Sequence, residues 1–138
     1  MDRTSIFLMV ASISAMALIG CSATQPPTLN EVRLTEKGGD CGSSVDLNTG
    51  DFMLLSLEGN PTTGYVWEIE SNDPAVIKSV GEPEFTADSS AIGAGGTYTL
   101  RFSAVAKGQT TLKLVYHRPF EKNVPAAKSC ELTINVKA

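Results

Sequence analysis

Beyond residue 50, apolar side chains recur at every second position through much of the chain, and this spacing restricts the fold more than any other feature. In residues 97–104, Tyr98, Leu100 and Phe102 share one face of the backbone, and polar residues occupy the other. That is the period of a half-buried strand, whereas a helix would repeat every 3.6 residues. The same alternation marks residues 65–70, 111–117 and 129–137, a more continuous apolar run covers residues 52–57, and weaker patterns cover residues 32–34, 44–47 and 76–80.

Short stretches rich in Gly, Pro and Asn separate these segments, and no helix of useful length is visible, although residues 73–76 could form one turn. About seven short strands within one domain predict an all-β fold, an immunoglobulin-like antiparallel β-sandwich. Trp67 is the expected core anchor. A small closed barrel is the alternative fold.

The N-terminal segment differs from the rest of the chain. Arg3 is followed by an apolar stretch from Ile6 to Ile19, which is short for a membrane-spanning helix and is typical of a secretion signal. Its end, Leu18-Ile19-Gly20-Cys21, resembles the bacterial lipobox, in which the Cys is acylated and becomes the first residue of the mature chain. An ordinary cleavage site beside a chance Cys is the alternative.

Three parts of the chain follow from this interpretation: a lipoprotein signal peptide (1–20), a lipid-anchored tether (21–29) and the β-sandwich domain (30–138). Acyl chains on Cys21 would hold the domain at a membrane surface without crossing it. We therefore expect the protein in the bacterial cell envelope, anchored to a membrane and facing the periplasm or the exterior.

If Cys21 carries lipid, Cys41 and Cys130 remain as an even pair in an oxidising compartment. A disulfide between them is the natural interpretation. Two free buried thiols that act as small hydrophobic side chains are the alternative.

Several function classes fit the chain poorly. The net charge is −4 and no run of Lys or Arg is present, so we expect no nucleic-acid partner. The single His, His117, lies on the polar side of its strand, and we expect no catalytic residues and no enzyme activity. Carboxylates do not cluster with His or Cys, so no metal is expected. We also expect no other cofactor. The protein is expected to be a monomer.

Three connections between the strands carry unusual chemistry. If successive strands alternate in direction, the first, third and fifth connections after residue 52 emerge at the same end of the sandwich. The first is uncharged and includes a proline and two hydroxyl side chains, the second is nearly free of side chains, and the third combines a guanidinium with an aromatic ring. Their residues are Asn60, Pro61, Thr62, Thr63, Gly64 and Tyr65; Gly93, Ala94, Gly95 and Gly96; and Arg118, Pro119, Phe120 and Glu121.

Each segment also has a plainer interpretation when taken alone. The first could be a turn that only satisfies backbone geometry, and the second could provide simple flexibility. In the third, Phe120 could fold back over the end of the sandwich while Arg118 pairs with Glu121.

Together and in this order, the segments resemble the chagasin family of cysteine-peptidase inhibitors, whose motifs are N-P-T-T-G-Y, G-x-G-G and R-P-W-E. Phe120 stands where the family motif has Trp. The resemblance implies reversible occupation of the active-site cleft of papain-like cysteine peptidases, with Thr62 and Thr63 nearest the catalytic Cys and His of the target. The other two loops would clamp the cleft from either side. An adhesion or ligand-binding module on the same fold is the alternative function.

Overall fold

The alternating segments form strands, as the spacing predicts. The computed structural model describes residue 20 and residues 30–138, so the predicted signal peptide, Cys21 and the rest of the tether lie outside the described part, apart from Gly20. Within it, no helix is long and apolar enough to cross a membrane. Its strands are β1 (Glu31–Thr35), β2 (Ser44–Asn48), β3 (Phe52–Gly59), β4 (Val66–Ser71), β5 (Ile77–Ser79), β6 (Glu84–Ala87), β7 (Gly96–Ala104), β8 (Gly108–His117) and β9 (Lys128–Lys137).

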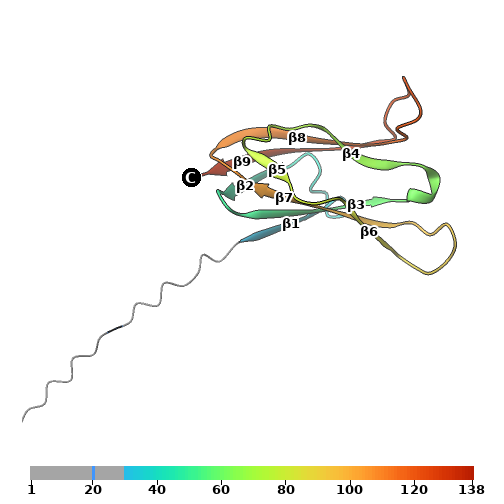
Figure 1. The fold of residues 1–138 in the computed structure, drawn as a ribbon, viewed down its shortest axis with the longest axis horizontal. Helices are drawn as coiled ribbons and strands as arrows, with labels where there is room; N and C mark the ends of the chain where they lie inside the picture. The colour runs from blue at the N-terminus through green and yellow to red at the C-terminus, as the bar shows by residue number, and fades with distance from the viewer. Residues whose placement is uncertain (1–19, 21–29) are drawn as a thin grey trace, which may run out of the picture.

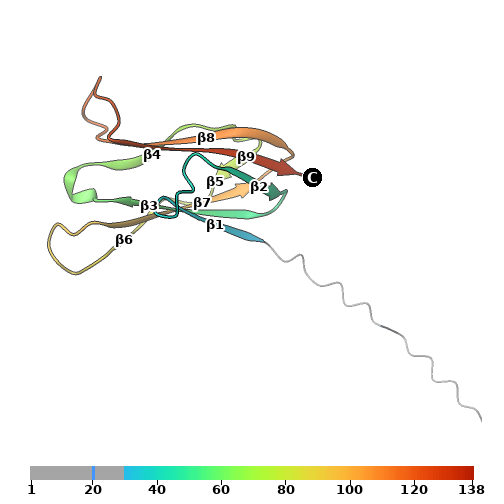
Figure 2. The same cartoon turned by 180° about the vertical axis from the view of Figure 1, so that it is seen from behind.

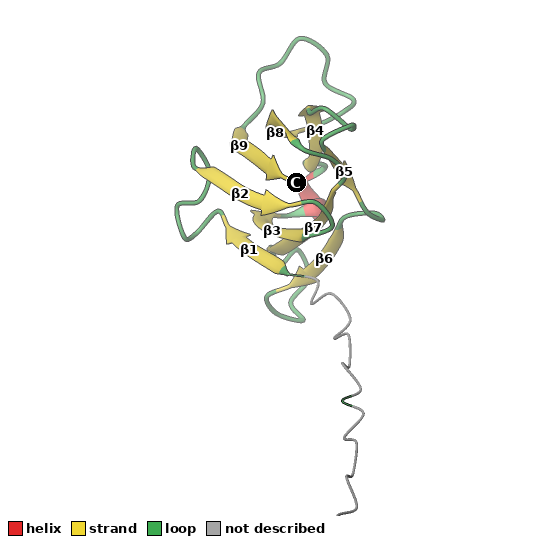
Figure 3. Ribbon diagram, turned by 90° about the vertical axis from the view of Figure 1, so that its left-hand side faces the viewer, coloured by secondary structure: helices red, strands yellow, loops and turns green. Residues whose placement is uncertain are grey.

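The strands form two layers, which confirms the predicted β-sandwich (Figure 3). One sheet has the order β1-β3-β7-β5, with β6 also paired to β7, and the other has the order β2-β9-β8-β4. Apolar side chains from both inner faces meet between the layers, among them Leu55, Phe102, Leu112 and Leu132, which are fully buried. Trp67 is buried with them, as expected. Each such side chain contributes about 1.5–3 kcal/mol through its removal from water.

Two details differ from the purely antiparallel, roughly seven-stranded prediction. The segment from residue 76 onward divides into β5 and β6, because Gly81 takes a left-handed φ of 72° and Pro83 has no N–H to continue the ladder. Strands β1 and β2 pair in parallel with β3 and β9. Residues 36–43 connect β1 to β2 and cross from the first sheet to the second. These two consecutive strands therefore lie in different sheets and do not pair with each other as an antiparallel hairpin.

A disulfide joins this crossover to the second sheet. Cys41 bonds to Cys130 of β9, with their Cα atoms 5.0 Å apart, which confirms the predicted pair. The bond closes a loop with a sequence separation of 89 residues, so it restricts the unfolded chain strongly.

The strand directions bring alternate connections to opposite ends of the sandwich. Loop 1 (residues 60–65) joins β3 to β4, loop 2 (residues 88–95) joins β6 to β7, and loop 3 (residues 118–127) joins β8 to β9. All three lie at the same end, on the right in Figure 1 and on the left in Figure 2, away from the C-terminus. The pairing of Gly59 with Gly96, and of Val66 with His117, requires this arrangement.

Candidate functional site

Loop 1 is a braced turn. Residues Pro61–Thr63 form one turn of 3-10 helix, whose cap is Asn60. The Asn60 Oδ1 atom accepts hydrogen bonds from the Thr62 N–H (3.1 Å) and the Thr62 hydroxyl (2.6 Å). Gly64 closes the turn with a φ of 83°, a conformation that favours glycine. Pro61, Thr62 and Thr63 are exposed, so the loop presents a rigid and uncharged tip.

Loop 2 is held against loop 1. The Asn60 Nδ2 group donates a hydrogen bond to the Gly93 carbonyl (2.9 Å), which joins the two loops directly. Gly93 is exposed with a φ of 78°, and Ala94 and Gly95 are partly buried.

Gly96 differs from the other glycines predicted for this segment. It belongs to β7 and is buried, and a Cβ atom there would lie 2.1 Å from the Thr86 carbonyl oxygen. This glycine therefore allows β6 and β7 to approach each other, and it lies beneath the exposed part of loop 2.

Loop 3 is tied to the other side of loop 1 through Arg118. The guanidinium Nε donates to the Thr63 carbonyl (3.0 Å), and its Cζ lies 4.5 Å from the centre of the Tyr65 ring. Its NH1 group also binds the Glu121 carboxylate at 2.9 Å, and this hydrogen bond raises the pKa of Arg118. Three contacts therefore fix one guanidinium at the junction of the two loops.

Phe120 remains 70% exposed, although its ring edge lies beside Gly64. The plainer interpretation of this segment therefore holds for the Arg118–Glu121 pair, whereas Phe120 leans on loop 1 at the end of the sandwich and stays largely exposed. An exposed aromatic ring in a loop is a common feature of a surface that binds another protein.

Sequence reasoning missed two further residues at this end. Ile92, at the tip of loop 2, is fully exposed, and Val124 of loop 3 is 55% exposed. The sequence could have indicated Ile92, because it is a large aliphatic residue among the Ser, Ala and Gly residues of loop 2. With Phe120, these side chains give the loop end an apolar character that the three motifs alone do not show.

Within the described part of the chain, the polar groups beside the loops include a cross-strand pair but no metal centre. His117 lies on β8 with its Nε2 atom 2.6 Å from the Glu68 carboxylate on β4, a cross-strand contact. Among residues 30–138, no group of three or more His, Cys, Asp or Glu side chains is placed to hold a metal ion.

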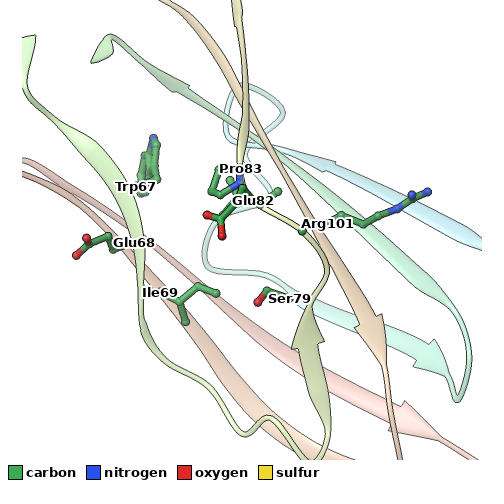
Figure 4. A pocket seen from close by; sticks show the side chains of 9 residues that line it. Trp67, Glu68, Ile69, Ser79, Glu82, Pro83 and Arg101 are labelled. Carbon is green, nitrogen blue, oxygen red and sulfur yellow. The ribbon is translucent and has the colours of Figure 1, made fainter. Parts of the chain in front are cut away.

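A separate hollow of about 320 Å³ lies on the side of the sandwich (Figure 4). It opens between β4 and the break after β5, and is lined by Trp67, Ile69, Ser79 and Pro83 among others. The loops protrude from the sandwich end, whereas this hollow lies along its flank, so the two features are distinct.

Comparisons with known proteins agree with this geometry. The family model described as Chagasin family peptidase inhibitor I42 matches residues 46–135. Amoebiasin-1 from Entamoeba histolytica is 31% identical over 107 residues, which cover 75% of this chain and 98% of that protein. Chagasin from Trypanosoma cruzi is 31% identical over 101 residues, which cover 70% of this chain and 90% of that protein.

A solved structure of a cysteine protease inhibitor from Entamoeba histolytica, EhICP2, has the same fold. Its TM-score is 0.70 at 25% sequence identity, and the match covers 81% of this chain and all of that one (100%). The similarity therefore extends over nearly the whole described domain.

Proposed function

This chain belongs to the chagasin family of peptidase inhibitors, and from that premise we propose that it inhibits papain-like cysteine peptidases reversibly by inserting its three-loop end into the active-site cleft. The observation that carries the mechanism is the pair of hydrogen bonds that fasten loop 1 to its neighbours, from Asn60 to Gly93 and from Arg118 to Thr63. These bonds make the three loops one rigid surface.

Loop 1 is the central wedge. Its exposed residues Pro61, Thr62 and Thr63 carry no charge, so their entry into a cleft avoids the desolvation of an ion. The 3-10 turn presents a folded backbone and not an extended one, so no peptide bond is offered in the orientation that cleavage requires. A preformed loop also loses little conformational entropy on binding, and this favours affinity.

Loops 2 and 3 flank the wedge. Loop 2 supplies the main chain of Gly93, Ala94 and Gly95 and the side chain of Ile92. Loop 3 supplies Pro119 and Phe120, while Arg118 and Glu121 hold its shape. Because Phe is smaller than Trp and lacks the indole N–H, Phe120 provides apolar contact without a hydrogen-bond donor at its tip.

The location of the inhibitor is part of the same proposal. Acylation at Cys21 anchors the chain to a membrane of the bacterial cell envelope, and residues 22–29 separate the domain from the surface. The domain acts as a monomer, with its loops free to reach a peptidase. Labelling with a radioactive fatty acid in cells tests the anchor: the label should appear in the wild-type protein and be absent after Cys21→Ser.

Inhibition of papain tests the central function. The chain from residue 22 should inhibit reversibly, with an apparent inhibition constant (Ki) that rises linearly with substrate concentration. The triple variant Thr62→Ala, Thr63→Ala, Phe120→Ala should be a much weaker inhibitor. A double variant at the opposite end, Thr49→Ala with Val105→Ala, is the control and should match the wild type. Equal inhibition by the triple variant would exclude these loops as the binding surface.

A further inference from the structure

Tyr116 connects the second sheet to the beginning of loop 1. It lies on β8 opposite Trp67 of β4, and its side chain is 8% exposed. Its hydroxyl reaches the end of β3 in the other sheet, where it accepts a hydrogen bond from the Asn60 N–H at 2.7 Å. A buried phenol needs such a partner, because an unpaired hydroxyl in an apolar interior is unfavourable.

The residue that Tyr116 holds is the one on which loops 1 and 2 depend. Asn60 accepts from Thr62 through its side chain, accepts from the Thr63 hydroxyl through its carbonyl (2.6 Å), and donates to Gly93 of loop 2. Fixing the backbone of Asn60 therefore fixes the start of the 3-10 turn and the contact with loop 2 together.

The ring of Tyr116 supports the other end of loop 1. Tyr65 stacks on it, with ring centroids 5.2 Å apart and an interplanar angle of 26°. The Arg118 guanidinium lies over that same Tyr65 ring. Trp67 packs against Tyr116 as well, at 5.1 Å, so the stack is anchored in the core. One side chain thus contacts both ends of loop 1 and, through Tyr65, supports Arg118 of loop 3.

We propose that Tyr116 is a positioning residue for inhibition: its hydroxyl holds Asn60, and thereby holds loop 1 in the binding conformation before the peptidase arrives. Its burial keeps it out of direct contact with the target. This role rests on the proposed function. If loop 1 samples other conformations when the hydroxyl is removed, the apparent affinity is the intrinsic affinity multiplied by the fraction of molecules whose loop stays in the binding conformation.

Tyr116→Phe removes the hydroxyl and keeps the ring, and Tyr98→Phe is the matched control. Tyr98, on β7, is also a largely buried ring, but its hydroxyl makes no hydrogen bond within residues 30–138 and keeps access to solvent, since no buried side-chain oxygen there lacks a partner. We expect Tyr116→Phe to raise the Ki for papain about tenfold, the effect of one net hydrogen bond, mainly through slower association. We also expect the Asn60 amide to exchange its hydrogen about tenfold faster in the free protein. Tyr98→Phe should change neither quantity.

The outcomes separate this inference from the proposed function. A merely structural role for Tyr116 would lower the melting temperature and leave the Ki, the association rate and the Asn60 exchange at wild-type values, and that result would overturn the inference. If the wild-type chain did not inhibit papain, the proposed function would fail and the inhibitory role of Tyr116 with it. Amide exchange would still report whether the hydroxyl holds loop 1, because that measurement needs no peptidase.

Discussion

Replacement of Asn60 by Ala tests whether the shape of the wedge depends on one side chain. Asn60 makes three side-chain hydrogen bonds, two to Thr62 within loop 1 and one to Gly93 in loop 2. The Ala variant loses all three and keeps the backbone bond to Tyr116. We expect loop 1 to lose its fixed turn and its contact with loop 2 while the sandwich stays folded.

The size of the effect follows from these three contacts. Each hydrogen bond contributes about 0.5–1.5 kcal/mol net, and the site is partly exposed to solvent, so the lower end applies. Three such bonds give about 1.5 kcal/mol, which corresponds to roughly a tenfold increase in Ki. This value of about 1.5 kcal/mol assumes that the three hydrogen bonds contribute independently. Because they share one side chain, their combined loss can have a larger effect than the sum.

Asn135 offers a matched control within the same protein. It is also partly buried, and its side chain makes three hydrogen bonds, to Gln109, Ser44 and Asp46. It lies near the C-terminal end of β9, away from the loops. Asn135→Ala should therefore lower the free energy of unfolding by a similar amount and leave the Ki for papain unchanged.

The assay is steady-state inhibition of papain with both variants, together with thermal unfolding of each. A wild-type Ki for Asn60→Ala would refute the reasoning, and so would an equal rise in Ki for Asn135→Ala. The second result would mean that inhibition follows overall stability and not the geometry of loop 1.

Three further predictions concern the scaffold. Gly96→Ala should lower the free energy of unfolding by about 1–3 kcal/mol, because the new Cβ overlaps the backbone of β6. Chemical denaturation measures this change. A wild-type stability would contradict the close approach of β6 to β7 at Gly96. Replacing Cys41 and Cys130 by Ser should lower the same quantity by about 2–5 kcal/mol in denaturant titration, whereas an unchanged midpoint would argue against a stabilising bond. A hydrogen bond from Lys37 lowers the pKa of Glu58 below the ordinary value of 4.5, so this ion pair stabilises the fold above about pH 4.5 and its contribution disappears as pH falls through the lowered pKa. The melting temperature should decline in that range less steeply in Glu58→Gln, and identical declines would contradict the assignment.

The sequence predicted the strands whose two faces differ most in polarity. The alternation in residues 97–104 and 111–117 reports which side chains enter the core, so β7 and β8 were predicted closely. Strand β5 lies within the predicted residues 76–80, but β6 was not predicted as a separate strand, because it depends on the local backbone at Gly81 and Pro83 and on competition for pairing with β7. The parallel pairing of β1 and β2 was also missed, since periodicity carries no information about strand direction.

The grouping of the three loops could be predicted, because strand alternation alone decides which connections share an end. Their mutual contacts could not. The bond from Asn60 to Tyr116 spans 56 residues and two sheets, and it depends on how far apart the layers pack. Gly96 was grouped with the loop glycines, since its sequence context is the same as theirs and only the closeness of Thr86 shows its structural role.

Hydrogen exchange of this protein, free and bound to papain, tests the central claim most directly. If one rigid surface of three loops occupies the peptidase cleft, the amides of residues 60–65, 92–95 and 118–121, other than Pro61 and Pro119, which have no N–H, should become protected on binding in all three loops. The turns at residues 72–75 and 105–107 should stay unchanged. Protection confined to one loop, or centred on those turns at the opposite end, would contradict it.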